Sequence, residues 1–395
     1  MLPKIFRMSQ NFDEIINREH TSSYKYDLRK MIFGTDDVLP MWVADTDFKA
    51  PSFILEAIRK RLDHGIFGYT IIGDDYYNSI IYWLKEQHGW EIKKEHIKFS
   101  PGAVPSLYAS VLAFTKPGDK VIVQPPVYYP FFSAVKESGR ELVLNPLILE
   151  NGRYHMNVND FKSKIDNRTR LFFLCSPHNP GGMVWRREEL SEICQVCLEN
   201  NILVISDEIH SDIVYQGFKH IPTATLGAEI EKNTITLNSP SKTFNIAGFS
   251  SSYIISSNSD LLHKISRHFE GMHISSGIFD IEATKAAYFH GKDWIRGLIA
   301  YFTNNVINVR TFLENNLPEI GLIEPEATYL LWLDFRKLNL NRKELSDLLV
   351  QKAKLGLSDG FQFGAEGNGF RRMNIGCALS KVNEALEAMA RFLKK

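Results

Sequence analysis

The stretch Ser239-Pro240-Ser241-Lys242-Thr243-Phe244-Asn245 decides how this chain is assigned to a fold. It follows an apolar run, Thr234-Leu237, that is typical of a strand, so Lys242 is expected just beyond a strand end. An enclosed lysine has a lowered pKa and can form a Schiff base with an aldehyde, and the hydroxyls of Ser239 and Ser241 are suited to a phosphate. A single lysine is most often a solvated surface charge, so this interpretation depends on three motifs upstream.

The first of these motifs, Ser100-Pro101-Gly102-Ala103-Val104, joins an apolar run, Ile97-Phe99, to a stretch with helical spacing, Val104-Phe114. The first N–H groups of a helix lack backbone partners and the helix dipole is positive there, so such a junction can bind a phosphate. Gly102 permits close approach of the anion. A glycine at a strand-to-helix turn is common, so this motif alone is a weak signal.

The other two motifs also follow apolar runs. Asp207 comes after Ile202-Ile205, where its carboxylate would face a pyridinium nitrogen and keep it protonated; a helix N-cap is the alternative. Asn179, after Leu171-Leu174, lies in a turn rich in proline and glycine, so its amide can donate to a phenolic oxygen; an Asx turn is the alternative. His210, one turn beyond Asp207, is either a second partner of that oxygen or a helix residue facing the substrate.

All four motifs stand at strand ends, and ligands of open α/β sheets bind beyond the carboxyl ends of the strands. An amine, a carboxylate, an amide and an anion-binding helix start are groups that hold pyridoxal phosphate (PLP). Each motif has an ordinary structural alternative, but the four alternatives would have to hold independently. The sequence therefore predicts a PLP site around Lys242.

Length and charge favour small molecules and other protein subunits as partners. The 395 residues favour two structural units over one. Lys plus Arg and Asp plus Glu number 46 each, without a basic stripe, so no direct nucleic-acid partner is expected. Residues 1–26 contain no continuous apolar segment, and no run approaches the ~18 apolar residues of a membrane span. We therefore expect no signal peptide, no membrane partner and a cytoplasmic location.

The four cysteines, Cys175, Cys194, Cys197 and Cys377, are too few and too irregularly spaced for a disulfide framework. Cys194 and Cys197 could be half of a metal site. However, they share the apolar positions of a stretch with helical spacing, Glu188-Asn200, and no second Cys or His pair follows. We expect reduced thiols on a buried helix face and no metal.

The apolar runs predict the fold class. Continuously apolar runs are typical of strands covered on both faces, so they indicate a mainly parallel seven-stranded sheet between helices, an α/β architecture. After about residue 290 the pattern indicates a smaller α+β unit. We expect a large domain at 48–290 and a small domain made of 1–47 and 291–395. The seven runs are Ile97-Phe99, Val121-Val123, Leu142-Leu144, Leu171-Leu174, Ile202-Ile205, Thr234-Leu237 and Tyr253-Ile255.

Further motifs carry a family resemblance. They are Lys25-Tyr26-Asp27, Phe67-Gly68-Tyr69-Thr70 and the run Met41-Trp42-Val43-Ala44-Asp45-Thr46-Asp47-Phe48. With the motifs above, the chain resembles the fold-type I PLP enzymes of the class I/II aminotransferase superfamily. Within it, the chain resembles the MalY/PatB branch of cystathionine β-lyases, or cysteine-S-conjugate β-lyases. The resemblance runs from about Phe12 to the C-terminus.

The resemblance implies a role for each matching residue. Lys242 would hold the cofactor aldehyde and act as the catalytic acid and base, Asp207 would face the ring nitrogen, and Asn179 would donate to the ring oxygen. Arg372 would bind the substrate carboxylate, and because side chains alternate along a strand, its neighbour Arg371 would point the other way. The remaining positions are Gly102, Ala103, Val104, Ser239 and Ser241 at the phosphate, Tyr128 stacked on the ring and beside the substrate, and His210.

Tyr69 matches a residue that reaches the phosphate of the neighbouring subunit, so the resemblance also implies a homodimer with shared active sites. Two departures stand out. Many aminotransferases of the superfamily have an arginine eight residues after the lysine, where this chain has Ser250, a difference that favours the lyase branch. The stretch Gly376-Cys377-Ala378-Leu379-Ser380 lacks the Pro-Arg usual after the cysteine in this branch.

The implied reaction is β-elimination on L-cystathionine or a related cysteine S-conjugate, giving a thiol such as homocysteine, pyruvate and ammonia. An aminotransferase acting on a small amino acid is the alternative, because both reactions share the removal of the Cα proton. A lyase that also binds a regulatory protein is a third possibility, which some relatives in this branch suggest.

Overall fold

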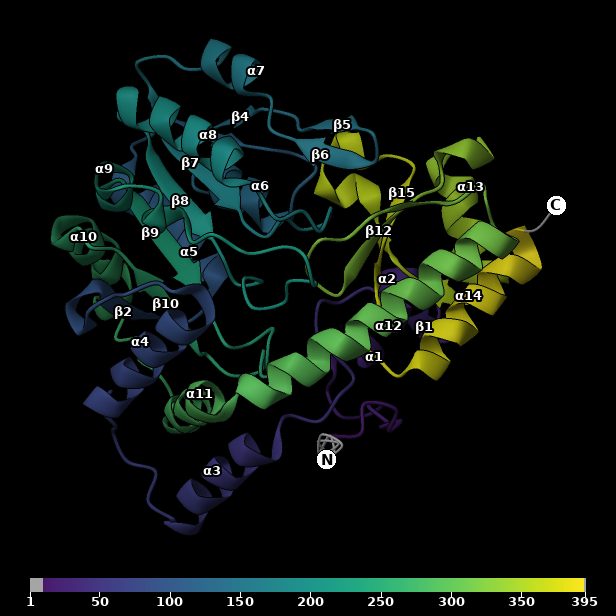
Figure 1. Cartoon of the computed structure of the whole chain (residues 1–395), viewed down its shortest axis with the longest axis horizontal. Coiled ribbons are helices and arrows are strands. Elements are labelled where there is room, and N and C mark those ends of the chain that lie inside the picture. The colour runs from purple at the N-terminus through teal and green to yellow at the C-terminus, as the bar shows by residue number, and fades with distance from the viewer. Residues whose placement is uncertain (1–9, 394–395) are drawn as a thin grey trace, which may run out of the picture.

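A seven-stranded sheet forms the core of the left-hand part of the molecule in Figure 1. The computed structural model describes residues 10–393. The strand order is β2-β10-β9-β8-β7-β3-β4, and all neighbours pair in parallel except β10, which is antiparallel to both β2 and β9. The predicted α/β class and mainly parallel sheet are confirmed, and each of the seven apolar runs falls in one strand, except that Ile202 precedes β8 by one residue. The strands are β2 (Ile97–Ser100), β3 (Lys120–Val123), β4 (Glu141–Leu144), β7 (Thr169–Cys175), β8 (Leu203–Asp207), β9 (Thr234–Asn238) and β10 (Ser252–Ile255).

Helices cover both faces of this sheet because successive strand residues point to opposite sides. On one face, Val121 and Phe173 belong to a buried cluster with residues of α5 (Ala103–Phe114), α6 (Pro130–Glu137) and α10 (Ser259–Glu270). On the other face, Ile122 and Phe172 pack with α7 (Val158–Ser163), α8 (Arg187–Glu199) and α9 (Ala228–Lys232). Near β10, Tyr253 packs with α4 (Asp74–His88) and α11 (Ile278–His290). The short hairpin of β5 (Ile148–Glu150) and β6 (Arg153–His155) lies outside the sheet.

A second, antiparallel sheet follows in the C-terminal part, with the order β11-β12-β15-β14. Its strands are β11 (Gly321–Ile323), β12 (Leu330–Asp334), β14 (Ser358–Asp359) and β15 (Phe370–Asn374). The 25-residue helix α12 (Lys292–Asn316) leads from the large sheet to this one and packs against α14 (Leu379–Leu393). The short helix α13 (Arg342–Asp347) precedes β13 (Leu355–Gly356).

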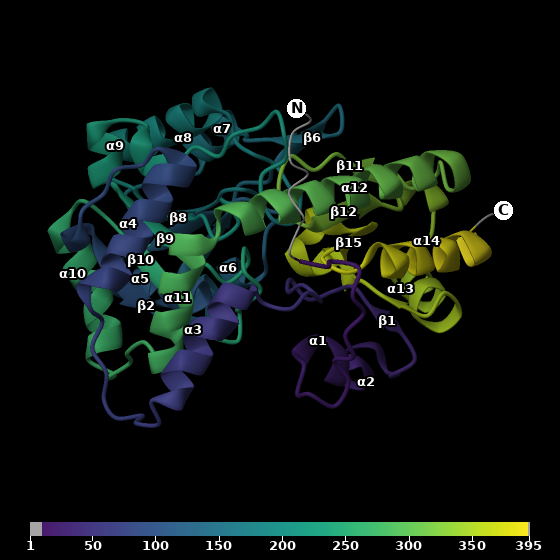
Figure 2. The ribbon, with the colours of Figure 1, turned by 60° about the horizontal axis from the view of Figure 1, so that its bottom comes forward.

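The N-terminal segment packs with the C-terminal part. Strand β1 (Leu39–Pro40) pairs in parallel with β13, placing Leu39 opposite Leu355. Figure 2 shows α1 (Tyr24–Asp27), α2 (Arg29–Phe33) and β1 on the same side as α13 and α14. This pairing supports the predicted division into a large domain, 48–290, and a small domain made of 1–47 and 291–395. The division stays a prediction. Residues 1–9 and 394–395 of the small domain lie outside the described part of the chain.

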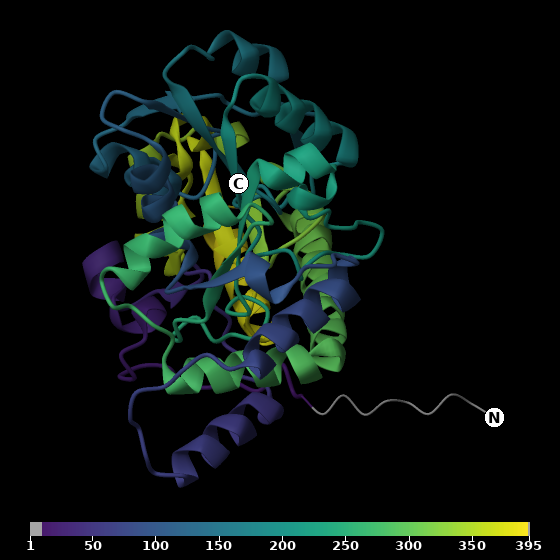
Figure 3. The ribbon, with the colours of Figure 1, turned by 90° about the vertical axis from the view of Figure 1, so that its left-hand side faces the viewer.

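The segment between α3 (Ser52–Asp63) and α4 lies at the periphery, and α3 forms the lower end of the view in Figure 3. Ile66, Tyr69 and Ile71 in this segment are among the most exposed large apolar or aromatic side chains of the described residues. Elsewhere, Cys194 and Cys197 are buried in α8, which confirms the predicted buried helix face, and all four cysteines are free thiols. No helix within residues 10–393 has the length and apolar character that crossing a membrane requires.

Candidate active site

The four predicted motifs meet at one cavity of about 250 Å³. Helix α5 begins there, and the turn after β7, the end of β8 and the loop after β9 supply the other walls. The register of the strands brings the motifs together, because Cys175 of β7 pairs with Asp207 of β8, and Asp207 in turn pairs with Leu237 of β9. The predicted residues that line the cavity are Gly102, Ala103, Val104, Tyr128, Asn179, Asp207, His210, Ser241 and Lys242.

Lys242 is partly buried and lines the cavity. Its Nζ donates a hydrogen bond to the carbonyl oxygen of Ala44 at 2.7 Å. Burial and the positive charge of Arg372 lower the pKa of Lys242 to about 8, while Asp45 and Asp207 act in the opposite direction. An amine with a pKa near neutrality can both give and take a proton, as a catalytic acid and base must.

Asp207 is buried, with 5% of its surface exposed. Its Oδ1 accepts a hydrogen bond from the backbone N–H of Ile209 at 3.3 Å. No lysine, arginine or histidine of the described residues lies within ion-pair distance of it. Burial raises its pKa to about 7, although Ile209 and Lys242 act to lower it. A carboxylate enclosed without a counter-ion needs a cation beside it, and a protonated pyridine nitrogen is such a group.

Arg372 and Asn179 are held together by a hydrogen bond, and Asn179 lines the cavity whereas Arg372 does not. Nη1 of Arg372 donates to Oδ1 of Asn179 at 3.0 Å, so the amide oxygen is occupied and the Asn179 NH₂ group is free to donate into the cavity. Nη2 of Arg372 donates to the carbonyl oxygen of Trp42 at 2.8 Å. The guanidinium is buried, has no carboxylate partner among the described residues, and its Nε has no hydrogen-bond partner. Such an unneutralised guanidinium is suited to a substrate carboxylate.

The neighbouring arginine, Arg371, makes different contacts. Nη1 of Arg371 forms an ion pair with Oδ1 of Asp359 at 3.0 Å, and its Nη2 donates to the Ser346 hydroxyl at 2.9 Å. The two arginines therefore face opposite sides of β15, as strand alternation predicts.

The start of α5 provides the anion-binding end of the cavity. A Cβ added at Gly102 would lie 3.2 Å from Cδ of Pro105, so the glycine also fits a tight local approach. Ser241 lines the cavity, whereas Ser239 does not; the Ser239 hydroxyl accepts a hydrogen bond from the Ser241 backbone N–H at 3.1 Å. Ser250 is exposed and lies outside the cavity lining.

Two ring side chains complete the predicted set. His210 is buried and its Nδ1 has no hydrogen-bond partner. Burial and the nearby charges of Lys242 and Arg372 lower its pKa to about 3, so the ring is neutral and can donate or accept one hydrogen bond. Burial raises the pKa of Tyr128 to about 12, which leaves its hydroxyl protonated.

Tyr69 is fully exposed and does not line the cavity of its own chain, so its role at a neighbouring subunit stays a prediction. The structure adds residues that the motifs did not assign to the site. Ala44 contributes a backbone carbonyl, which no residue type signals. Cys175 could have been found from its place at the end of a strand next to Asp207. The unassigned lining residues are Ala44, Pro101, Pro105, Cys175, Ile209, Ala247, Phe249 and Ser252.

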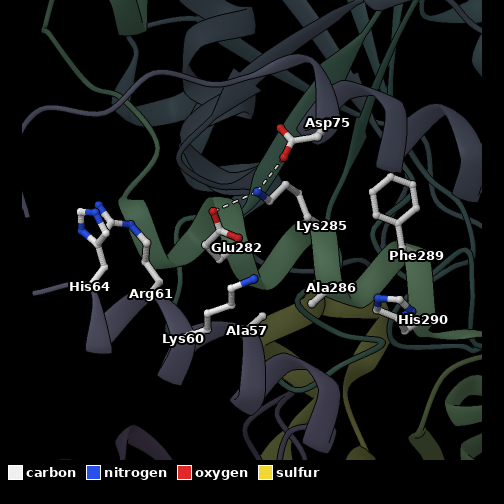
Figure 4. A pocket seen from close by; sticks show the side chains of 10 residues that line it. All are labelled: Ala57, Lys60, Arg61, His64, Asp75, Glu282, Lys285, Ala286, Phe289 and His290. Atoms are coloured by element: carbon white, nitrogen blue, oxygen red, sulfur yellow. Dashed lines mark hydrogen bonds and ion pairs between the residues drawn. The ribbon is translucent and has the colours of Figure 1, made fainter. Parts of the chain in front are cut away.

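A larger groove, of about 590 Å³, lies between α3 and α11 (Figure 4). Its Lys285 forms ion pairs with Asp75 at 2.8 Å and Glu282 at 2.9 Å. Burial acts to lower the pKa of Lys285, but these two carboxylates outweigh it and raise the pKa above its usual value. A lysine that is held charged cannot attack an aldehyde, so we place the chemistry in the smaller, more enclosed cavity.

Comparison with known proteins places this cavity in a family context. The sequence model described as "Aminotransferase class I and II" matches residues 38–389. The chain belongs to the class I and II aminotransferase family. A curated relative in this family, cystathionine beta-lyase PatB of Bacillus subtilis, is 42% identical over 95% of this chain and 98% of its own.

Solved structures of family members have the same fold. Cystalysin from Treponema denticola, whose structure contains pyridoxal 5'-phosphate, has a TM-score of 0.95 and 34% identity over 98% of this chain and 99% of its own. The PLP-bound C-S lyase from Staphylococcus hominis has a TM-score of 0.92 and 33% identity over 99% of this chain and 100% of its own. The fold-type I assignment is therefore confirmed.

The residues present fit the cofactor of these family members. Asp207 lacks a counter-ion, Nδ1 of His210 lacks a partner, and the amide of Asn179 is oriented by Arg372. Each is a buried polar group left incomplete by the protein's own contacts, and a phosphorylated pyridine aldehyde would complete them.

Proposed function

We propose that the protein is a PLP-dependent carbon–sulfur β-lyase that cleaves L-cystathionine or related cysteine S-conjugates to a thiol, pyruvate and ammonia. The observation that carries the proposal is Lys242, a buried amine whose pKa is lowered to about 8, in one cavity with an unpaired Asp207. The 42% identity to a cystathionine beta-lyase over nearly the whole chain supports this choice of reaction.

Each side chain of the site has a separate role in the proposed reaction. We propose that Arg372 binds the α-carboxylate of the substrate and so places its Cα proton near Nζ of Lys242. Bound PLP supplies the electron sink for the charge left when that proton is removed. Asp207 maintains the ring nitrogen in its protonated form, because an enclosed carboxylate is stabilised by a cation. Lys242, once protonated, can then return the proton to the departing thiolate.

The remaining residues hold the cofactor. We propose that the N–H groups at the start of α5 and the hydroxyls of Ser239 and Ser241 bind the phosphate, and that Asn179 and His210 contact the ring oxygen. Tyr128 lies where its ring can stack on the pyridine and contact the substrate. The walls of the cavity exclude water from the amine, which keeps the pKa of Lys242 low.

A cystathionine assay tests the reaction directly. Wild-type protein loaded with PLP should release pyruvate and a free thiol in equal amounts, and Lys242→Ala should reduce this rate by at least a thousandfold. Lys285→Ala, which removes the ion-paired lysine of the groove in Figure 4, is the matched control and should retain activity. A wild-type protein that stays colourless with added PLP would reject the proposal.

The family also includes aminotransferases, so transamination is the second candidate. It shares proton removal by Lys242 and differs in the product. Formation of a 2-oxo acid from the amino acid, with an aminated cofactor and no free thiol, would favour it over the lyase. A regulatory protein-binding role is compatible with either reaction and stays a prediction.

We also propose a cytoplasmic homodimer with shared active sites. The four free thiols fit a reducing compartment. The exposed segment with Ile66, Tyr69 and Ile71 provides apolar surface for a partner subunit. If Tyr69 serves the neighbouring site, mixing inactive Lys242→Ala with inactive Tyr69→Ala subunits should restore activity, because each mixed dimer then has one intact site. Absence of recovery in mixed dimers would place Tyr69 outside the partner's site.

A further inference from the structure

A buried polar network adjoins Lys242 and Asp207 in the sequence without lining the cavity. At its centre, Asp212 accepts three hydrogen bonds. Its Oδ1 accepts from Nε1 of Trp83 at 3.0 Å and pairs with Nε2 of His88 at 2.9 Å, while its Oδ2 accepts from Oγ1 of Thr243 at 2.7 Å. Both the His88 and the Asp212 side chains are about 95% buried.

The network contacts the residues that follow Lys242 and Asp207 in the sequence. Thr243 follows Lys242 directly, so the Thr243 hydroxyl fixes the backbone that carries the lysine. The ring of His88 packs edge-to-face on His220, with centroids 5.4 Å apart, and Nε2 of His220 lies 2.9 Å from Oε2 of Glu208. Glu208 follows Asp207 directly. One continuous set of contacts thus connects the residue after the amine to the residue after the carboxylate.

None of these groups lines the cavity, and none is needed to contact a substrate. Structural stability alone does not require a buried carboxylate, since replacing a whole buried charged pair by apolar residues of similar volume is often neutral or stabilising. A second hydrogen bond also holds Thr243, because Nε1 of Trp294 donates to its carbonyl oxygen at 2.8 Å. The hydroxyl and the carbonyl oxygen of Thr243 are therefore each held by a side chain from another segment, Asp212 in the turn after β8 and Trp294 in α12.

We propose that Asp212 is a positioning residue for the reaction, holding Lys242 in its reactive orientation through the hydroxyl of Thr243. The inference rests on the proposed role of Lys242. Because proton transfer requires closely aligned atoms, a small displacement of the amine reduces turnover steeply. Arg372 lies on β15 outside this network, so binding of the substrate carboxylate should be little affected.

Thr243→Val and Thr243→Ser form the test pair. Valine preserves the shape of the side chain but removes the hydroxyl, and serine preserves the hydroxyl. We expect Thr243→Val to lower kcat by roughly tenfold or more with KM within about twofold, and Thr243→Ser to recover most of the rate. A misplaced lysine should also shift the midpoint of the pH titration of the bound cofactor's absorbance, a readout independent of turnover.

Thr284→Val is the matched control. Thr284 is fully buried in α11, and its hydroxyl donates to the Asp280 carbonyl oxygen at 2.8 Å, so this variant loses a similar buried hydrogen bond far from the lysine. It should retain the wild-type kcat and absorbance titration. Asp212→Asn provides a second perturbation if Thr243→Val folds poorly; it keeps the volume of the side chain and should give the same separation of kcat from KM.

The outcomes are distinct. If wild type is coloured and active while Thr243→Val and Asp212→Asn match Thr284→Val in kcat and in absorbance midpoint, the positioning role is refuted and the proposed function stands. An equal loss in Thr243→Ser and Thr243→Val would also refute it, because the hydroxyl would then be irrelevant. If wild type fails to bind PLP, the proposed function fails and this inference fails with it.

Discussion

Because the carboxylate of Asp207 is unpaired, the free energy of unfolding should depend on pH in a way that can be tested without any substrate. Burial raises its pKa from 3.8 to about 7 in the folded chain. A group with a raised pKa in the folded state binds its proton more tightly there than in the unfolded chain. Its contribution to stability is therefore fully present below about pH 4 and is lost as the pH rises through about 7.

The size of the effect follows from the two pKa values. Relative to low pH, burial of Asp207 should cost the cofactor-free fold about 4 kcal/mol at pH 8, where the folded carboxylate is ionised. At pH 5 the cost should be only about 2 kcal/mol, because the group has lost its proton in the unfolded chain but keeps it in the folded one. Asp207→Asn keeps the shape of the side chain and its oxygen acceptor for Ile209 but removes the charge. In the cofactor-free protein, the gain in stability from this substitution should increase by about 2 kcal/mol between pH 5 and pH 8.

Urea unfolding of the cofactor-free protein at both pH values measures this gain. Asp47→Asn is the matched control, because Asp47 is also buried but pairs with Lys25 at 3.0 Å and Arg18 at 2.8 Å. Burial acts to raise the pKa of Asp47, yet these cations outweigh it and hold the pKa below its usual value. Asp47→Asn should therefore destabilise the fold by the same amount at pH 5 and pH 8, because the stability that ionised Asp47 contributes is lost only below about pH 4. If Asp207→Asn gives no pH-dependent gain, the carboxylate is not isolated as described and its proposed pairing with a cofactor cation loses its basis.

Three further predictions concern Arg372, a tight glycine turn and cofactor binding. Arg372→Lys keeps the positive charge but loses the two nitrogens that donate to Asn179 and Trp42. In steady-state kinetics, kcat/KM for cystathionine should therefore fall by roughly a hundredfold. A change under threefold would contradict the role assigned to Arg372. Gly360→Ala would place a Cβ 2.1 Å from the Gly367 carbonyl oxygen, so the thermal unfolding midpoint should fall by several degrees; an unchanged midpoint would show that the turn adjusts. Cofactor-free protein should melt at a lower temperature than PLP-loaded protein in calorimetry, because binding to the folded state alone stabilises it; equal midpoints would argue against PLP binding.

The fold could be predicted from the sequence because its determinants are local. Each apolar run, such as Val121-Val123, became a strand, since a strand covered on both faces has no alternative to continuous apolar side chains. The antiparallel direction of β10 was not predicted, because the direction of a strand depends on the connection before it rather than on its own residues. The placement of β1 beside β13 likewise depends on contacts over more than 300 positions of chain.

The site was partly predictable for a related reason. Lys242 and Asp207 carry unusual chemistry at strand ends, so their residue types marked them. The carbonyl of Ala44 was not marked, because every residue has one, and the contact with Lys242 exists only after two segments 198 positions apart have packed together. Asp212 and Thr243 were also missed, since an aspartate and a threonine near a strand end have many ordinary roles.

Helix α12 gives the two sheets an unequal freedom to move. It is anchored at Trp294, beside the lysine segment, and its 25 residues extend about 37 Å toward α14 and the C-terminal sheet. A rigid rod fixed at one end pivots there, so a tilt of about five degrees would carry the distant end by ~3 Å while the lysine segment stays in place. Any opening of the protein to admit a substrate would thus swing the arginine-bearing strand β15 about a stationary amine, rather than move the amine itself.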